Sequence, residues 1–317
     1  MANKNKKQNN ESFGTMTRFN RISPVSNAIL VVLMILLAVV SLYPVLLMIA
    51  VSFSSQASLY AKGYTLFPAE WSLAAYESVM KLGAGLWKAY GVTIIRTIVG
   101  TLFSLFCMSQ YAFVLAQKNF NCRKFYTYYI FFTMVFSAGM IPSYIINVRY
   151  LHLDDTIWIL ILPGAIVASN VIILRTFITS TIPEALFESA RIDGASNFRV
   201  FVQIVLPLFK PGLATIALFS VVSRWNEWFV GMLYINKNKD LTPVQTVLQR
   251  IQANMEYLKE QANKGGLTPD QQEAYLKLPT ESFRMAVTVI ATIPILFAYP
   301  FFQRYFIEGL TIGSVKG

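Results

Sequence analysis

Two short segments carry most of the polar side chains that could do chemistry in this otherwise apolar sequence. The first, 181–207, combines carboxylates with small residues in a pattern typical of a short amphipathic helix and a turn: Glu184, Glu188, Ser189, Ala190, Asp193, Gly194 and Ala195. The second places an arginine, an amide and a carboxylate among indole rings: Arg224, Trp225, Asn226, Glu227 and Trp228. An aromatic ring can stack on the apolar face of a ring-shaped polar solute while an amide or carboxylate bonds its hydroxyls.

The first segment has the local signals of two short helices joined by a turn. Thr181 can cap the first helix, Pro183 suits its first turn, and Glu184 stands three residues after Thr181 as in a capping box. Gly194 supplies the backbone freedom to end this helix, and Ser196 can start the second. A helix–turn–helix is therefore predicted. On these signals alone, an ordinary amphipathic connector between two longer elements is an equally good interpretation.

Long apolar runs surround both segments. Hydrophobic residues make up 55% of the chain and charged residues 14%, whereas a soluble domain carries roughly 25% charged residues. A helix that crosses a hydrocarbon core of ~30 Å needs about 20 apolar residues. Five runs contain no Asp, Glu, Lys or Arg and are long enough for this: 28–51, 97–117, 125–148, 156–174 and 285–303. They do not alternate as barrel strands do, so an all-α integral membrane protein is predicted.

Residues 211–236 are also long enough to span but contain two charged residues, so five or six spans are possible. Basic residues gather on one side when six spans are drawn, with both termini cytoplasmic. The net charge of +11 then reflects topology rather than nucleic-acid binding. The predicted organisation is a cytoplasmic tail, 1–26, and a transmembrane domain, 27–317. Its spans are expected at about 28–51, 90–117, 125–148, 156–177, 208–236 and 284–306, with 181–207 inside and 237–280 outside.

The residue order in 181–207 resembles the EAA loop of bacterial ABC importer permeases. Glu188-Ser189-Ala190 is followed by Asp193-Gly194-Ala195 and then by Ile204-Val205-Leu206-Pro207; Ser189 stands where alanine is usual. Other segments resemble the carbohydrate-uptake branch, which contains the smaller maltose-type permease, and permeases for oligosaccharides and polysaccharide fragments: 139–144, 182–207, 223–229, 299–306 and 309–317. The similarity covers nearly all of the chain after the tail.

The resemblance implies a type I ABC importer permease fold with six spans in the bacterial cell membrane. The chain has no Gly-x-x-x-x-Gly-Lys-Ser/Thr loop, so it is not expected to be an enzyme, and ATP and Mg would be bound by a partner ATPase. The implied partners are a second homologous permease in a heterodimer, two cytoplasmic ATPases, an extracellular solute-binding lipoprotein and the lipid bilayer. Glu188 would be the charged contact with an ATPase, Ala190 and Ala195 close-packing positions, and Gly194 the turn of this coupling helix.

The implied function is ATP-driven uptake of a sugar, most simply an oligosaccharide, by rocking of the spans around a midplane site. Two alternatives stay open: an ion-coupled secondary transporter with the same helices, and an ABC importer of a non-sugar solute. The loop 237–280 can face the binding protein or be a solvated loop. Cys107 and Cys122 match no metal motif, and no disulfide is expected between them.

The charged residues within the spans also allow two interpretations. Arg224 and Glu227 can contact the sugar, or they can form an internal pair while the neighbouring tryptophans pack at the interface. Arg96 and Arg284 lie at predicted span edges, so they are expected to extend to lipid headgroups.

Overall fold

The computed structural model describes residues 23–81, 83–264 and 280–314, and the regular structure in these ranges is helical. The described part contains one isolated antiparallel bridge, between Ser54 and Trp71. The predicted all-α fold class is confirmed. Residues 1–22 of the predicted tail and 265–279 of the predicted outside loop lie outside the described residues.

Two helices are long and apolar enough to cross a membrane by themselves, α2 (Pro24–Ser52) and α5 (Ala84–Ala116). Two pairs of helices also pass when each pair is taken together, but each bends at a short break. The pair within 123–150 bends by 113° and the pair within 197–226 by 80°. The described residues therefore hold two candidate spans, or up to four if each bent pair is one span, and the predicted six are not confirmed.

The first bent pair falls in the charge-free run that was expected to form one span, 125–148. Helix α6 (Arg123–Val135) ends there, and α7 (Met140–Ile145) begins after four residues and continues as a π-helical turn, Ile146–Tyr150. Gly139 has a φ of +86°, a conformation that glycine adopts without the penalty other residues incur. Hydropathy reports which solvent a segment needs, whereas the direction of the backbone depends on such local positions.

The remaining helices are mostly short. Before α5 lie α3 (Gln56–Lys62) and α4 (Ala74–Met80). After the 3₁₀ turn Ile157–Leu160 come α8 (Ala168–Thr181), α9 (Glu184–Ile192), α10 (Asn197–Val200) and α11 (Leu206–Leu208). The last are α12 (Lys210–Asn226), α13 (Phe229–Tyr234), α14 (Val244–Asn263) and α16 (Thr280–Ser314).

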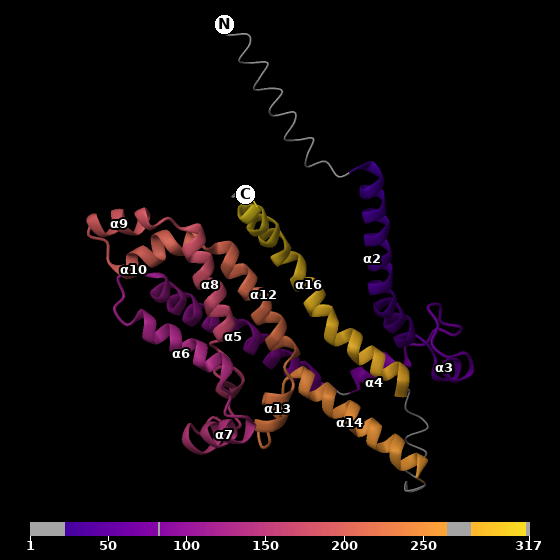
Figure 1. Ribbon diagram of the computed structural model, residues 1–317. Helices are drawn as coiled ribbons and strands as arrows, with labels where there is room; N and C mark the ends of the chain where they lie inside the picture. The colour runs from indigo at the N-terminus through magenta and orange to yellow at the C-terminus, as the bar shows by residue number, and fades with distance from the viewer. Residues whose placement is uncertain (1–22, 82, 265–279, 315–317) are drawn as a thin grey trace.

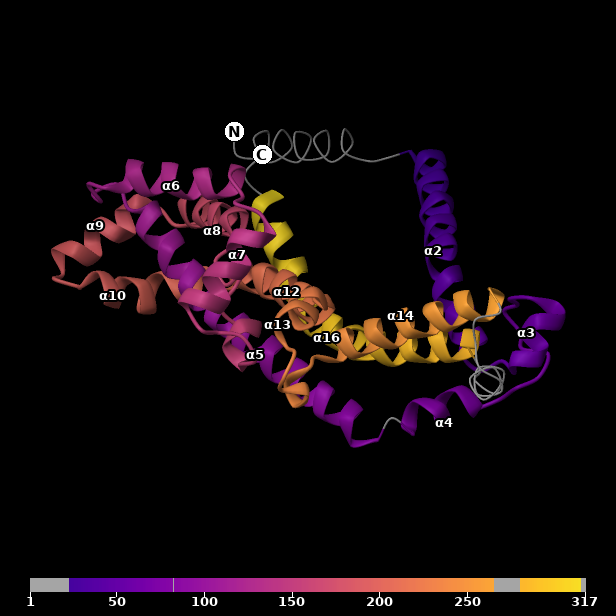
Figure 2. The same cartoon turned by 90° about the horizontal axis from the view of Figure 1, so that it is seen from below.

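Helices α5, α6, α8 and α12 form a bundle, and α5 contacts each of the other three (Figure 1). Helices α9 and α10 lie at one end of this bundle, while α13 and α14 lie toward the opposite end. Helix α16 contacts α12 on one side and α2 on the other, and α14 runs beside it (Figure 2). The two segments of interest, 181–207 and 224–228, are thus placed at one end of the bundle and further along α12, respectively.

The largest apolar core lies between α5, α8 and the short helices that follow α8. Its fully buried members include Met108, Val171, Leu174, Val205 and Phe209. A second core joins α4, α14 and α16 around Val79, Val244 and Ala286. Helix α9 contributes to the first core, so it is packed against the bundle and is not a free loop.

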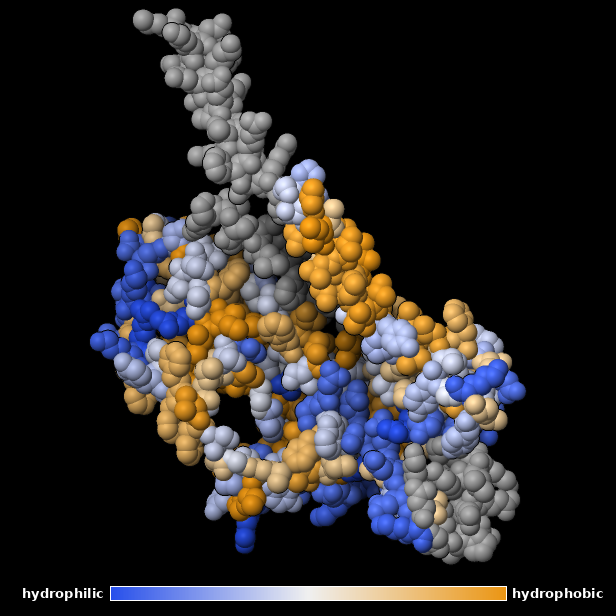
Figure 3. Space-filling view, turned by 45° about the vertical axis from the view of Figure 1, so that its right-hand side comes forward, coloured by the Kyte–Doolittle hydropathy of each residue, from blue (hydrophilic) through white to orange (hydrophobic). Residues whose placement is uncertain are grey.

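Helix α2 differs from the other long helices because its apolar surface is left uncovered. Only its last three residues, Ala50, Val51 and Ser52, are buried. Leucines, isoleucines and valines around the rest of the helix are largely exposed, and they form a continuous apolar ridge (Figure 3). A helix that is apolar on all sides suits a lipid environment or the apolar surface of another subunit.

Candidate functional site

The start of the coupling segment differs from the prediction that Thr181 caps the first short helix. Thr181 is the last residue of α8, and α9 begins at Glu184 after Pro183, whose side chain cannot cap it. Ile182 is extended, with φ −104° and ψ 113°, as expected for a residue that precedes a proline. That preference moves the break between the helices one residue beyond Thr181, so the capping-box interpretation was wrong.

The end of α9 and the start of the second short helix agree with the sequence signals. Gly194 has a φ of +74°; its N–H donates to Arg191 O at 3.0 Å, and Ala195 N–H donates to Ala190 O at 2.9 Å. These two bonds make a Schellman motif, the usual glycine-dependent helix ending. Ser196 caps α10, because its hydroxyl accepts from the backbone N–H of Arg199 at 3.3 Å.

Helix α9 presents charge outward and buries small and aromatic side chains. Ala190 is buried, and the ring of Phe187 lies 6.4 Å from that of Phe113 on α5. Among the predicted coupling residues, Glu184 and Ala195 are half-buried, and the rest are exposed: Glu188, Ser189, Asp193 and Gly194. The exposed side chains therefore form an acidic surface that a partner can reach.

Two large apolar side chains on this surface were not identified from the sequence. Ile192 is 87% exposed at the end of α9, and Phe198 is 71% exposed on α10. The spacing of the buried pair Phe187 and Ala190 could have indicated this, because residues three apart share one helix face and Ile192 falls on another. Exposed apolar groups beside carboxylates are typical of a protein–protein contact surface.

Both ends of α9 are tied to the region where α5 ends. Arg191 Nη2 donates to Gln117 Oε1 at 2.6 Å, and Gln117 directly follows the last residue of α5. At the other end, Lys118 Nζ lies 3.5 Å from Glu184 Oε2. The second contact is exposed and weak, but the first is a half-buried charge-assisted hydrogen bond.

The second segment of interest lies where α12 gives way to α13. Helix α12 ends at Asn226 and α13 begins at Phe229. Glu227 stands in the break, and its Oε1 accepts from the N–H groups of Phe229 at 2.8 Å and Val230 at 3.0 Å. A carboxylate is favourable there because the first N–H groups of a helix lack partners and carry partial positive charge.

Arg96 is buried behind this break, contrary to the expectation that it extends to lipid headgroups. Its side chain is 2% exposed, and its Nη1 lies 3.7 Å from Glu227 Oε2. Its Nη2 donates to the carbonyls of Arg224, at 2.7 Å, and Glu227. These carbonyls belong to the end of α12, where acceptors lack helical partners. The sequence places Arg96 at the edge of a predicted span, but in the fold its guanidinium donates hydrogen bonds to the carbonyls at the end of α12.

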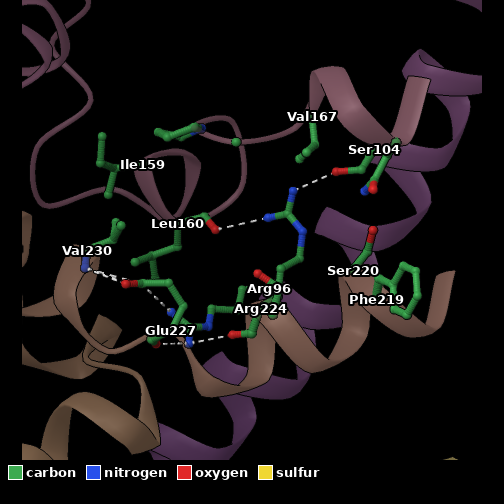
Figure 4. Close-up of a pocket in the computed structure, with 14 residues that line it drawn as sticks. Arg96, Ser104, Ile159, Leu160, Val167, Phe219, Ser220, Arg224, Glu227 and Val230 are labelled. Carbon is green, nitrogen blue, oxygen red and sulfur yellow. Dashed lines mark hydrogen bonds and ion pairs between the residues drawn. The ribbon is translucent and has the colours of Figure 1, made fainter. Parts of the chain in front are cut away.

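Arg224 does not form the internal pair with Glu227 that the sequence allowed. Its Nη2 donates to Ser104 Oγ at 2.7 Å, and its Nη1 donates to Ile161 O at 3.1 Å and Leu160 O at 3.5 Å (Figure 4). The side chain thus joins α12 to α5 and to the segment after the 3₁₀ turn. Glu227 takes Arg96 as its cationic partner instead.

Arg96, Arg224 and Glu227 line a pocket of about 410 Å³ between α5, α8 and α12. The other polar groups on its wall are Ser104, Asn170, Ser220 and Ser223. Three of the predicted pathway residues do not line it. The Trp225 indole is buried and donates to Ala291 O on α16 at 3.0 Å, Asn226 bonds Val222 O, and Trp228 packs edge-on against Phe229.

No group of three His, Cys, Asp or Glu side chains within 23–81, 83–264 and 280–314 is placed to hold a metal ion. Cys107 and Cys122 are both free thiols. The polar chemistry of the described residues is therefore concentrated in the coupling surface of α9 and α10 and in the pocket around Arg224.

A family model described as the inner membrane component of binding-protein-dependent transport systems matches residues 111–311, which is more than half of the chain. The chain belongs to this family. It is the permease subunit of an ABC importer, an integral inner-membrane protein with several spans, and not itself an ATPase. A family of this kind works with an ATPase and a solute-binding protein, so the ion-coupled secondary transporter is no longer a competing interpretation.

Similar proteins cover almost the whole chain. Protein LplC of Bacillus subtilis (strain 168) is 41% identical over 278 residues, which cover 88% of this chain and 90% of that protein. The polygalacturonan/rhamnogalacturonan transport system permease protein YtcP of the same organism is 37% identical over 287 residues, covering 90% and 96%. A solved structure of a bacterial ABC transporter involved in the import of the acidic polysaccharide alginate matches with a TM-score of 0.72 and 30% identity, covering 90% of this chain and 99% of that chain. The resemblance to carbohydrate importer permeases is confirmed.

Proposed function

We propose that this permease translocates an oligosaccharide that a solute-binding protein delivers from outside the cell. The observation that carries the proposal is the full-length similarity to permeases that are named for polygalacturonan/rhamnogalacturonan and for arabinooligosaccharides, and to the alginate importer. The test is ATP-dependent uptake of labelled oligosaccharides by liposomes containing the complete importer. Uptake of a non-sugar solute with no uptake of any glycan would contradict the proposal.

The proposed assembly contains a second homologous permease, two cytoplasmic ATPases that bind ATP and Mg, and an extracellular lipoprotein. In this assembly the chain crosses the membrane six times, with both termini in the cytoplasm. Helix α2 forms the first crossing and α5 the second. Helices α6 and α7 together form the third, and α8 forms the fourth with the segment before it. Helices α12 and α13 form the fifth, and α16 forms the sixth. Reaction of single introduced cysteines with a membrane-impermeant reagent tests this topology: a cysteine at Ser196 is expected to react only from the cytoplasmic side.

Helix α8 alone is too short for the fourth of these crossings. Helix α8 has 14 residues, or about 21 Å at the α-helical rise per residue, which is less than the ~30 Å hydrocarbon core. The segment 157–167 must then complete the crossing with a 3₁₀ turn and irregular backbone. Irregular backbone at membrane depth is tolerated where it is buried in protein or lines a cavity, and this segment lines the pocket at Leu160, Gly164 and Val167.

Coupling to ATP hydrolysis is proposed to run through α9. Glu188 and Asp193 offer charge to an ATPase groove, while Ile192 and Phe198 offer apolar contacts. A displacement of α9 reaches the bundle through the buried ring of Phe187 and through the bond from Arg191 to the end of α5. The remaining predicted coupling residues, Glu184, Ser189, Ala190, Gly194 and Ala195, hold this helix in its place and shape.

On the opposite side, the proposed outside loop 237–280 begins with a folded surface. Its helix α14 packs Val244 and Leu248 into the core shared with α16. The loop is proposed to face the binding protein, and a rigid helix at that surface gives a partner a fixed shape to contact. Crosslinking of an introduced cysteine at exposed Tyr257 to the binding protein tests this; crosslinks confined to the ATPase would contradict it.

A further inference from the structure

The pocket around Arg224 is bounded by two interruptions of helical structure, and both fall within crossings of the proposed topology. One is the irregular segment 161–167 before α8, and the other is the break between α12 and α13 at Glu227. Each interruption leaves backbone groups that lipid cannot satisfy. Arg224 supplies donors to the first and Arg96 to the second. A pocket that two broken helices share in a membrane is the kind of place where polar solutes are bound.

The charges in this pocket do not cancel. Arg96 is paired with Glu227 at 3.7 Å. Arg224 has no carboxylate within ion-pair distance among residues 23–81, 83–264 and 280–314. Its protein partners in these ranges are the hydroxyl of Ser104 and two backbone carbonyls, all of them neutral. An unpaired cation away from water is costly, and its most favourable partner is an anion.

The guanidinium of Arg224 also keeps donors free. An arginine has five N–H donors, and those that Arg224 gives to the protein come from Nη1 and from one position on Nη2. Within the described part of the chain, Nε and the second proton of Nη2 have no acceptor. These two free N–H groups are available to the oxygens of an anion, which form stronger hydrogen bonds with a guanidinium than neutral acceptors do.

The position of this guanidinium depends on a glycine in α5. A Cβ added at Gly100 would lie 2.5 Å from Arg224 Nη1 and 2.9 Å from its Nε. Because Gly100 has no side chain, the guanidinium can lie flat against the helix and reach Ser104 one turn further on. The cation is thus held at one place in the pocket wall.

We propose that Arg224 binds a carboxylate of the translocated sugar, so that the substrate class is an oligosaccharide containing uronic acid. This rests on the proposed function and adds the charge of the substrate. The pocket volume of about 410 Å³ lies within the ~300–1,000 Å³ range of small-molecule sites. Ser220, Ser223 and Asn170 offer hydrogen bonds to hydroxyls, and the half-exposed ring of Phe219 offers an apolar face.

The first test measures the charge preference of the pocket without relying on the binding protein. Cys107 and Cys122 are replaced by serine, and Ser223→Cys places a thiol in the exposed pocket wall. The complete importer is treated with a methanethiosulfonate carrying a sulfonate and, separately, one carrying a trimethylammonium group. The anionic reagent is expected to react faster, and Arg224→Gln is expected to reduce the ratio of the two rates about tenfold, the worth of a charge-assisted contact. An unchanged ratio would overturn the proposal.

The same thiol reports on the ligand. A dimer of uronic acid is expected to slow labelling in the parent and in Arg224→Lys, but not in Arg224→Gln; a neutral dimer with the same linkage is expected to protect none of them. Equal protection by both dimers would overturn the proposal. Arg284→Gln, outside the pocket and half-exposed, serves as the matched control for loss of one positive charge.

Uptake separates this inference from the proposed function. Liposomes with the complete importer are offered uronic-acid oligomers and neutral oligomers of equal length. Uptake of the acidic oligomers with a KM raised about tenfold in Arg224→Gln supports both. Uptake of neutral oligomers alone would overturn the role of Arg224 and leave the proposed function intact, whereas no uptake of any glycan would sink the proposed function itself. If the importer with Arg224→Gln fails to assemble, Gly100→Ala is tested instead, because it displaces the guanidinium without removing its charge. An unchanged preference for acidic oligomers in the Gly100→Ala variant would overturn the proposal.

Discussion

Arg191 on α9 donates a hydrogen bond of 2.6 Å to Gln117, the residue directly after the end of α5. The coupling helix is thereby attached to the longest apolar helix of the bundle by a polar contact as well as by packing. Along the chain, α9 is followed by α10, α11 and α12, so its movement can also reach α12 directly. The contact identifies α5 as a second route for the movement.

The bond between Arg191 and Gln117 is expected to matter for coupling more than for folding. Arg191→Met removes a half-buried charge-assisted hydrogen bond, worth roughly 1.5–3 kcal/mol, while keeping a long side chain over the same surface. Uptake by reconstituted importer should fall severalfold, with ATP hydrolysis retained. Arg199→Met is the control, because the side chain of Arg199 is exposed and, among the described residues, bonds only Gln203. Equal uptake by both variants would contradict the assignment.

Gly194→Val is expected to uncouple ATP hydrolysis from uptake while the protein remains inserted in the membrane. A Cβ at Gly194 would meet no atom within 4 Å, so the effect comes from the backbone. The φ of +74° costs an L-residue about 1–2 kcal/mol, and a β-branched residue is among the least tolerant. Gly194→Asn is the matched control, because asparagine adopts this conformation more readily. Normal uptake by the valine variant would rule out a role for the turn in coupling.

Two glycine substitutions in α5 are expected to change stability in opposite directions. Gly91→Ala should raise the free energy of unfolding by up to about 1 kcal/mol, because a Cβ there meets nothing within 4 Å and alanine favours the helix. Gly100→Ala should lower it, because the added Cβ displaces the Arg224 guanidinium from Ser104 and from the carbonyl of Ile161. Thermal unfolding in detergent or nanodiscs compares them. Equal changes in Tm would show that the guanidinium is not held as described.

Asp155 is expected to make stability depend on pH at the surface near α13. Its Oδ1 accepts from the N–H groups of Asn236, Lys237 and Asn238 at 2.7–3.0 Å. Desolvation is the largest single influence and raises the pKa of this carboxyl, but the backbone bonds together with Lys237 outweigh it, so the pKa is lowered from its ordinary value.

A lowered pKa in the folded state means that the stabilisation is present above the unfolded-state pKa and is lost as pH falls through the folded-state pKa. The Tm difference between the parent and Asp155→Asn should therefore be largest near neutral pH and shrink in acid. Asp154→Asn controls for loss of a neighbouring carboxylate. A Tm difference that stays constant from neutral to acidic pH would contradict the assignment.

The sequence predicted the helical class, the two long spans and the local shape of the coupling segment, because these depend on nearby residues. Gly194 and Ser196 behave as their types suggest. Thr181 does not, because the preference of Ile182 before a proline decides where α8 ends. Local signals compete within a few residues, and here the extended conformation of Ile182 before Pro183 outweighs the capping preference of Thr181.

The site around Arg224 was only partly predictable. Arg224 and Glu227 were recognised because charges stand out in an apolar run, but the acceptors of Arg224 and the arginine that pairs with Glu227 come from segments more than sixty residues away. Arg96 was assigned to the membrane edge because sequence gives its distance along a helix and not what packs beside it. Only the fold shows that, among the described residues, Glu227 has a cationic partner and Arg224 has no anionic one.

The uncovered surface of α2 has a consequence for how this protein is made. A helix whose backbone hydrogen bonds are all internal can enter lipid alone, and within the described residues α2 touches the rest of the chain mainly through α16, which is synthesised much later. Until α16 has been synthesised, α2 lacks its main contact within the chain. The bundle around α5, in contrast, can form its core only after α8 and α12 have been made. Membrane insertion of α2 and assembly of the bundle are therefore separate events, and α2 joins its own subunit only after α16 has been made.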